Sequence, residues 1–127
     1  MMKILLLDGD QVGKKLDHAI LTNDLDDFAN LSEDITGYFR LLANILQASG
    51  LVVVMQGGDS LAAKGNLERD LVLKILSIKG PVTVSIGVGP SILNAFLAMR
   101  FAKSEGGSCG FEFFNNPDTG FLFSKIS

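Results

Sequence analysis

The segment from Leu51 to Ala63, LVVVMQGGDSLAA, constrains the fold of this 127-residue chain more than any other stretch. Its β-branched, apolar first half predicts a buried strand, and the glycines Gly57 and Gly58 predict a tight turn. The residues after the turn predict a second strand, and Asp59 stands at the first bend out of the turn. The segment therefore predicts a strand, a turn and a second strand, with a carboxylate at one end of a sheet.

A second acidic cluster follows the first predicted strand. Residues 3–7, KILLL, form a mostly apolar run of the kind found in central strands, and Asp8, Gly9 and Asp10 come directly after it. If this strand neighbours the hairpin, the carboxylates of both lie side by side. Carboxylates gathered in this way are typical of a site that binds a metal ion together with a nucleotide.

The remaining patterns predict the other elements in chain order. Helices are expected at 11–17, from Ser32 to Ser49-Gly50, from an Asn66 cap to Gly80-Pro81, and from Ser91 to Gly106-Gly107. A strand is expected at 82–88 and a terminal hairpin around a turn at 115–120, whereas 20–31 predict no clear element.

This order of elements predicts the fold class. It is β-α-β-β-α-β with an extra early helix and an appended helix plus hairpin, which indicates an α+β, ferredoxin-like domain with a mostly antiparallel sheet and helices on one face. In this arrangement the first strand is central and antiparallel to the third. Asp8, Asp10 and Asp59 are therefore expected to converge.

Composition limits the other possibilities. The length favours a single domain over residues 1–127, and the net charge of −3 gives no general attraction to a DNA template. Hydrophobic residues make up 47% of the chain, yet no apolar run approaches the roughly 18 residues of a membrane span. A single cysteine, Cys109, excludes an internal disulfide, and the start of the chain lacks a signal-peptide pattern, so we expect a cytoplasmic protein without membrane contact.

The acidic residues suit a divalent cation. Mg²⁺ prefers oxygen ligands and usually takes one or two carboxylates plus phosphates and water. Two such ions about 3.5–4 Å apart can activate an attacking hydroxyl and stabilise the leaving oxygen together, and Asp8 and Asp59, helped by the Gly9 carbonyl, are the expected bridging ligands. Asp10 either joins them or lies behind them. The opposing interpretation is that DGD and GGD are only turn sequences, but their occurrence at adjacent strand ends favours the metal site.

Two further features are consistent with a bound triphosphate. Backbone amides of Gln11, Val12 and Gly13, at the start of a predicted helix, are placed to bind phosphates. Lys103 lies near the C-terminal end of the last helix, where a lysine also compensates the helix dipole, so the pattern leaves both roles open.

Four motifs carry a family resemblance: LLLDGD, VVVMQGGDSLA, VTVSIGVG and AFLAMRFAKSEGG, in this order over nearly the whole chain. With them the chain resembles the palm domain shared by GGDEF diguanylate cyclases, class III nucleotidyl cyclases and the polymerase subunit of type III CRISPR complexes. It most resembles the stand-alone minimal CRISPR polymerases.

The resemblance implies a site and an activity. Asp8, the Gly9 carbonyl and Asp59 would bind Mg²⁺ or Mn²⁺, and Lys103 would contact the triphosphate. Gly57 and Gly58 would let the turn approach the nucleotide. The implied activity joins nucleoside triphosphates into a cyclic di- or oligonucleotide with release of pyrophosphate. The product would be detected by a separate effector in antiphage defence.

Two departures from the family pattern leave alternatives open. Ser60 replaces the usual Asp or Glu, although its hydroxyl still suits a water or a weak ligand, and Gly107 replaces the arginine usual after the last helix of diguanylate cyclases. Residues that read guanine do not align, so ATP is favoured over GTP. Besides a cyclase or polymerase working as a homodimer, the sequence is compatible with a catalytically degenerate nucleotide-binding sensor or a purely structural module.

Overall fold

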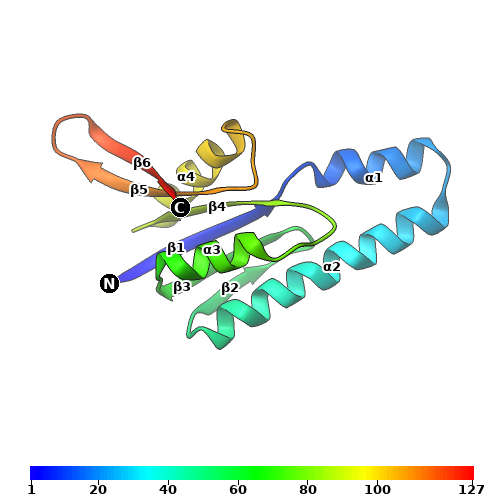
Figure 1. Ribbon diagram of the computed structural model, residues 1–127, viewed down its shortest axis with the longest axis horizontal. Helices are drawn as coiled ribbons and strands as arrows, with labels where there is room; N and C mark the ends of the chain where they lie inside the picture. Colours follow the sequence, from blue (N-terminus) through cyan, green and yellow to red (C-terminus); the bar gives the residue numbers. More distant parts are fainter.

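The computed structural model describes residues 1–127 as four helices and six strands (Figure 1). In chain order these are β1 (Met2–Gly9), α1 (Val12–Leu21), α2 (Leu25–Ala48), β2 (Val52–Gln56), β3 (Ser60–Asn66), α3 (Arg69–Ser77), β4 (Val84–Gly89), α4 (Ile92–Ser104), β5 (Gly110–Asn116) and β6 (Gly120–Ile126). None of the helices combines the length and the apolar content needed to cross a membrane.

All six strands form one sheet in the order β2-β3-β1-β4-β5-β6. The β1 strand is central and pairs antiparallel with both β3 and β4, whereas β4 and β5 are parallel and β5 and β6 form the terminal hairpin. The predicted α+β class with a mostly antiparallel sheet is confirmed. The first four strands in space have the ferredoxin-like arrangement, and the β5–β6 hairpin extends the sheet beyond β4.

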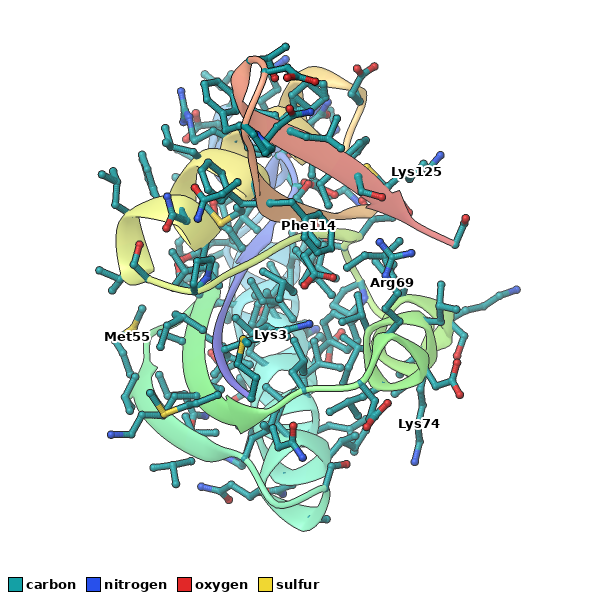
Figure 2. The ribbon with its side chains drawn as sticks, turned by 90° about the vertical axis from the view of Figure 1, so that its left-hand side faces the viewer. Lys3, Met55, Arg69, Lys74, Phe114 and Lys125 are labelled. Carbon is teal, nitrogen blue, oxygen red and sulfur yellow. The ribbon has the colours of Figure 1, made fainter.

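Helices cover both faces of this sheet, whereas the sequence predicted helices on one face. On one face, the alternating residues Leu5, Leu7 and Ile86 pack against Phe39 of α2 and Ile75 of α3 in the main hydrophobic core. On the other face α4 lies directly on β4. The two are so close that a Cβ atom at Gly87 would collide with the backbone of α4. Figure 2 shows α4 (yellow) and α3 (green) on opposite sides of the strands.

Two predicted helix starts are wrong. The prediction placed the start of α2 at Ser32, but the helix begins at Leu25 and its cap is Asp24, whose carboxylate accepts a hydrogen bond from the Asp27 amide. Asn66 does not cap α3, because β3 continues through this residue opposite Met2, and α3 starts after Glu68. The predicted Ser91 cap of α4 is confirmed by its bond from the Asn94 amide.

Candidate metal and nucleotide site

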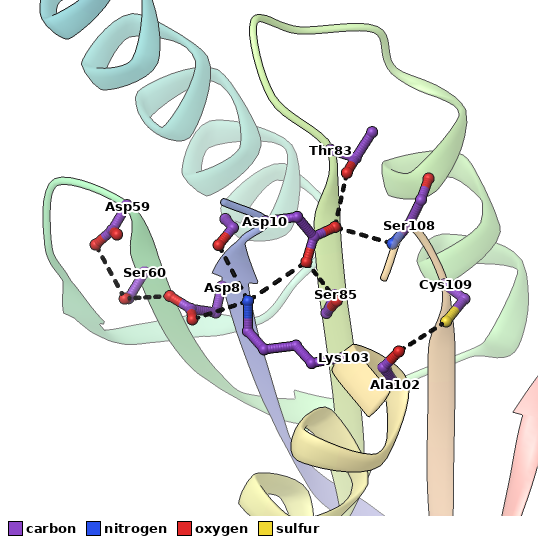
Figure 3. Close-up of polar contacts among 11 residues, drawn as sticks. Asp8, Asp10, Asp59, Ser60, Thr83, Ser85, Ala102, Lys103, Ser108 and Cys109 are labelled. Carbon is purple, nitrogen blue, oxygen red and sulfur yellow. Dashed lines mark hydrogen bonds and ion pairs between the residues drawn. The ribbon is translucent and has the colours of Figure 1, made fainter. Parts of the chain in front are cut away.

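Strand register brings the predicted carboxylates of β1 and the hairpin together. Asp8 lies opposite Ser60 of β3 on one side and Ser85 of β4 on the other. The Gly9 amide donates to the Asp59 carbonyl at 2.8 Å and thereby ties the hairpin turn to the end of β1. The Ser60 hydroxyl lies 2.9 Å from Asp8 Oδ1 and 3.4 Å from Asp59 Oδ1 (Figure 3). Ser60 thus bridges the two carboxylates.

The ammonium group of Lys103 lies among the oxygens at the end of β1. Its Nζ atom donates to the Gly9 carbonyl at 3.0 Å and forms ion pairs with Asp8 Oδ2 at 3.2 Å and Asp10 Oδ1 at 3.3 Å (Figure 3). Lys103 comes from the last turn of α4, which the close contact with Gly87 holds against the sheet. Three oxygens from consecutive residues are therefore arranged around one positive charge.

Asp10 is bound by groups distant in sequence. Its carboxylate accepts hydrogen bonds from the Ser85 hydroxyl at 2.6 Å, the Thr83 hydroxyl at 2.7 Å and the Ser108 amide at 2.9 Å. Burial alone would raise the pKa of Asp10, but these bonds, together with the charge of Lys103, hold its pKa below the ordinary value. The contacts fix the Asp10 carboxylate to β4 and to the loop after α4.

Gly107 makes room for this arrangement. Its φ is +75°, and a Cβ at this position would lie 2.8 Å from the Asp10 carboxyl carbon. A residue with a side chain would therefore be strained and would press on Asp10. The absence of a side chain at Gly107 thus leaves the space that the Asp10 carboxylate occupies.

Asp10 converges with Asp8 on the Lys103 ammonium group but does not complete a three-acid cluster with Asp8 and Asp59. No three His, Cys, Asp or Glu side chains are gathered in a way that suits a metal ion. Asp10 lies beside the other acids, with its oxygens engaged by Ser85, Thr83 and Ser108. Asp10 thus lies behind the expected metal ligands, which is one of the two positions that the sequence left open for it.

The remaining donors fit a divalent cation. Asp8 and Asp59, which Ser60 bridges, supply two partly exposed carboxylates, and the Gly9 carbonyl already binds a positive group. Two carboxylates and a carbonyl are a suitable donor set for Mg²⁺, which completes its octahedron with phosphate and water. Asp8, Asp59 and the Gly9 carbonyl are therefore the groups that would hold a divalent cation here.

The residues predicted to bind phosphate, Gln11, Val12 and Gly13, stand at the start of α1. Gln11 has a left-handed backbone, with φ 55°, and its side chain does not cap the helix, so the first amides of α1 receive no side-chain acceptor. Gln11 and Gly13 are exposed, whereas the Val12 side chain is buried. The structure thus leaves the amides of this turn available to a phosphate.

A cavity of about 280 Å³ opens beside Asp59. Its walls come from α1, α2 and the β2–β3 turn, and it is lined by Val12, Leu16, Ser32, Ile35, Thr36, Gly58 and Asp59. The sequence pattern missed Thr36, and it assigned Ser32 to a helix cap although Ser32 lies within α2. The sequence did contain a signal for this lining: Ser32 and Thr36 are polar residues four positions apart on an otherwise apolar helix face.

Comparison with solved structures defines the class. The guanylyl cyclase domain of the RhoGC fusion protein from Blastocladiella emersonii, a double mutant, is similar with a TM-score of 0.65 at 9% identity, over 99% of this chain and 93% of that one. A rhodopsin-guanylyl cyclase core of converted specificity, in complex with ATPαS, gives 0.60 at 9% identity, over 98% and 93%. A diguanylate cyclase/phosphodiesterase from Caldicellulosiruptor saccharolyticus gives 0.63 at 20% identity, over 88% and 75%. The fold is that of a nucleotide-cyclase palm domain.

The family follows from the sequence itself. Residues 4–111 match the minimal CRISPR polymerase domain, mCpol, and the chain belongs to this family. The resemblance carried by the four sequence motifs is confirmed. No curated protein matches the chain. Family and fold together support an enzyme of the nucleotidyltransferase type.

Proposed function

We propose that the chain is a metal-dependent nucleotidyltransferase that joins ATP into a cyclic di- or oligonucleotide. The observation that carries the proposal is the convergence of Asp8 Oδ2 and the Gly9 carbonyl on one cationic group, with Asp59 linked to Asp8 through Ser60. Oxygens of this kind are the usual protein ligands of a triphosphate-bound Mg²⁺ or Mn²⁺. Such a cation, when bound, would lower the pKa of the attacking ribose hydroxyl and offset the charge on the phosphates.

The protein's own groups would position the nucleotide. Lys103 supplies a positive charge for the triphosphate, and the uncapped first turn of α1, at Gln11, Val12 and Gly13, supplies amide donors. Gly57 and Gly58 carry no side chain, and a Cβ on Gly58 would meet nothing within 4 Å, so the turn is open to a ligand. Asp10 holds the end of β1 in place.

The cavity beside Asp59 suits the base. Ser32 and Thr36 each both donate and accept hydrogen bonds, which suits the adjacent amino group and ring nitrogen of adenine. Guanine instead presents two adjacent donors, for which a carboxylate is the better partner. Asp59 is the one acidic residue among those that line the cavity. The ATPαS bound to a structural neighbour is consistent with an adenine nucleotide.

Incubation with ATP or GTP and Mn²⁺, followed by mass spectrometry, tests the activity. We expect a cyclic adenine nucleotide and pyrophosphate from the wild type, and neither from Asp8→Asn or Asp59→Asn. Asp118→Asn, an exposed change in the β5–β6 turn, is the matched control and should retain activity. Product from Asp59→Asn at the wild-type rate would refute the assignment.

Ser60 favours a second candidate function, a nucleotide sensor without turnover. The hydroxyl lies between Asp8 and Asp59 but adds no charge, so the site has one acid fewer than the resemblance to the family implies. A sensor would bind ATP with Mn²⁺ and release no pyrophosphate. Isothermal titration run beside the product assay separates the two functions.

The setting of the activity is also a proposal. Membership of the minimal CRISPR polymerase family supports a cytoplasmic role in antiphage defence, in which a separate effector detects the cyclic product. Phage plaque counts on cells that carry the gene with its neighbours test this role. The Asp59→Asn variant should lose the protection.

A further inference from the structure

We propose that Lys103 is an internal cation that keeps the metal site closed until a nucleoside triphosphate binds. The inference rests on the proposed function, because it concerns the same carboxylates. Lys103 Nζ contacts Asp8 Oδ2 at 3.2 Å and the Gly9 carbonyl at 3.0 Å. A divalent cation on these two oxygens would repel the ammonium group, so the two cations exclude each other.

The neighbouring acids respond differently to the departure of Lys103. Asp10 has three other donors, from Ser85, Thr83 and Ser108, and stays anchored without the lysine. Asp8 has only the Ser60 hydroxyl besides Lys103. Removal of the ammonium group therefore exposes the Asp8 carboxylate and the Gly9 carbonyl without loosening the end of β1.

The Lys103 side chain is able to move, and a bound triphosphate would attract it. This side chain is 25% exposed, and its long stem with rotatable bonds lets the ammonium group change partners at little cost. A triphosphate beside the site offers several negative oxygens. The nucleotide would draw Lys103 away from Asp8, and the metal would take its place.

This exchange couples the two ligands. A metal ion alone must displace Lys103 without compensation, whereas a metal ion with a triphosphate gives the lysine a new partner. Metal and nucleotide should therefore bind with positive cooperativity, each raising the affinity for the other by the same factor. This coupling would favour binding of the complete metal–nucleotide complex over binding of the metal ion alone.

Mn²⁺ binding to the full chain tests the inference, measured by electron paramagnetic resonance with and without α,β-methylene ATP. We expect Lys103→Met and Lys103→Gln to bind Mn²⁺ alone about tenfold more tightly than the wild type, the size expected when a lysine paired with two partly exposed carboxylates is removed. The same variants should bind the ATP analogue with Mn²⁺ more weakly. Lys103→Arg keeps the charge and should bind Mn²⁺ alone as weakly as the wild type.

Lys74→Met is the matched control, since it removes the same charge from α3 at an exposed position (Figure 2). It should change neither affinity. Unchanged or weaker binding of Mn²⁺ alone by both neutral Lys103 variants would overturn the inference. The Asp8→Asn variant distinguishes a failure of this inference from a failure of the proposed function. If it binds Mn²⁺ as tightly as the wild type in the presence of the analogue, the proposed metal site itself is wrong.

Discussion

Asp8 and Asp10 are separated only by Gly9, yet their carboxylates have different surroundings. Asp8 keeps a partly exposed carboxylate that a ligand can reach, whereas Asp10 is enclosed by hydroxyls from β4 and its preceding loop and by the Ser108 amide. Its lowered pKa means that the ionised form stabilises the fold. This contribution is present above the unfolded-state pKa, near 4, and is lost as the pH falls through the lower folded-state value.

Asp10→Asn should therefore destabilise the protein in a pH-dependent way. We expect a loss of about 1–2 kcal/mol in the free energy of unfolding at neutral pH, because hydrogen bonds to a charged acceptor are lost. The difference from the wild type should shrink as the pH falls from about 5 to about 3. Urea unfolding at several pH values measures it, with Asp118→Asn as the control. An equal difference at every pH would contradict the role assigned to the charge.

The sequence predicted some of these residue roles and not others. Asp8 and Asp59 stand at the ends of recognisable strands, so the local pattern located them. Asp10 has the same local pattern, but its partners Thr83, Ser85 and Ser108 lie more than 70 positions away. Only the folded chain shows that they take up its carboxylate.

At the scale of elements, the contact of α4 with β4 positions Lys103. Gly87→Ala should destabilise the protein by about 3 kcal/mol, since its Cβ would press into the backbone of α4 at Ala95 and Met99. Gly37→Ala, in α2, is the opposite control: its Cβ meets nothing within 4 Å, and alanine is the better helix former by about 1 kcal/mol. Thermal unfolding of the two variants should shift in opposite directions. A Gly87→Ala protein as stable as the wild type would contradict the close packing of α4.

Element types were easier to predict than their limits. The α2 helix starts seven residues before the expected Ser32, because Asp24 caps it and acidic residues fill its first turn. That acidic stretch looks like a loop by composition alone. Likewise, Asn66 looks like a helix cap, but pairing with Met2 on β1 keeps it in β3. Long-range strand pairing outweighed the local preference.

At the scale of the whole molecule, the predicted sheet order followed from the succession of elements, and a central β1 placed Asp8 beside the hairpin. The number of chains in the active form does not follow from the fold. The proposed site of each chain offers a single set of triphosphate contacts, Lys103 and the uncapped start of α1, whereas a cyclic dinucleotide requires two activated nucleotides. The activity should therefore require two chains, each presenting one nucleotide.

Dimeric catalysis predicts a rate that depends on chain concentration. We expect the initial rate per chain to rise with protein concentration and then level off as dimers form, which product formation and analytical ultracentrifugation with Mn²⁺ and the ATP analogue would show together. Excess Asp59→Asn chain added to a fixed amount of wild type should lower the rate, since wild-type chains become trapped in mixed pairs with one competent site. Asp118→Asn added in the same excess should instead raise it. A rate per chain that is independent of concentration and unaffected by the Asp59→Asn chain would mean that one chain completes the reaction alone.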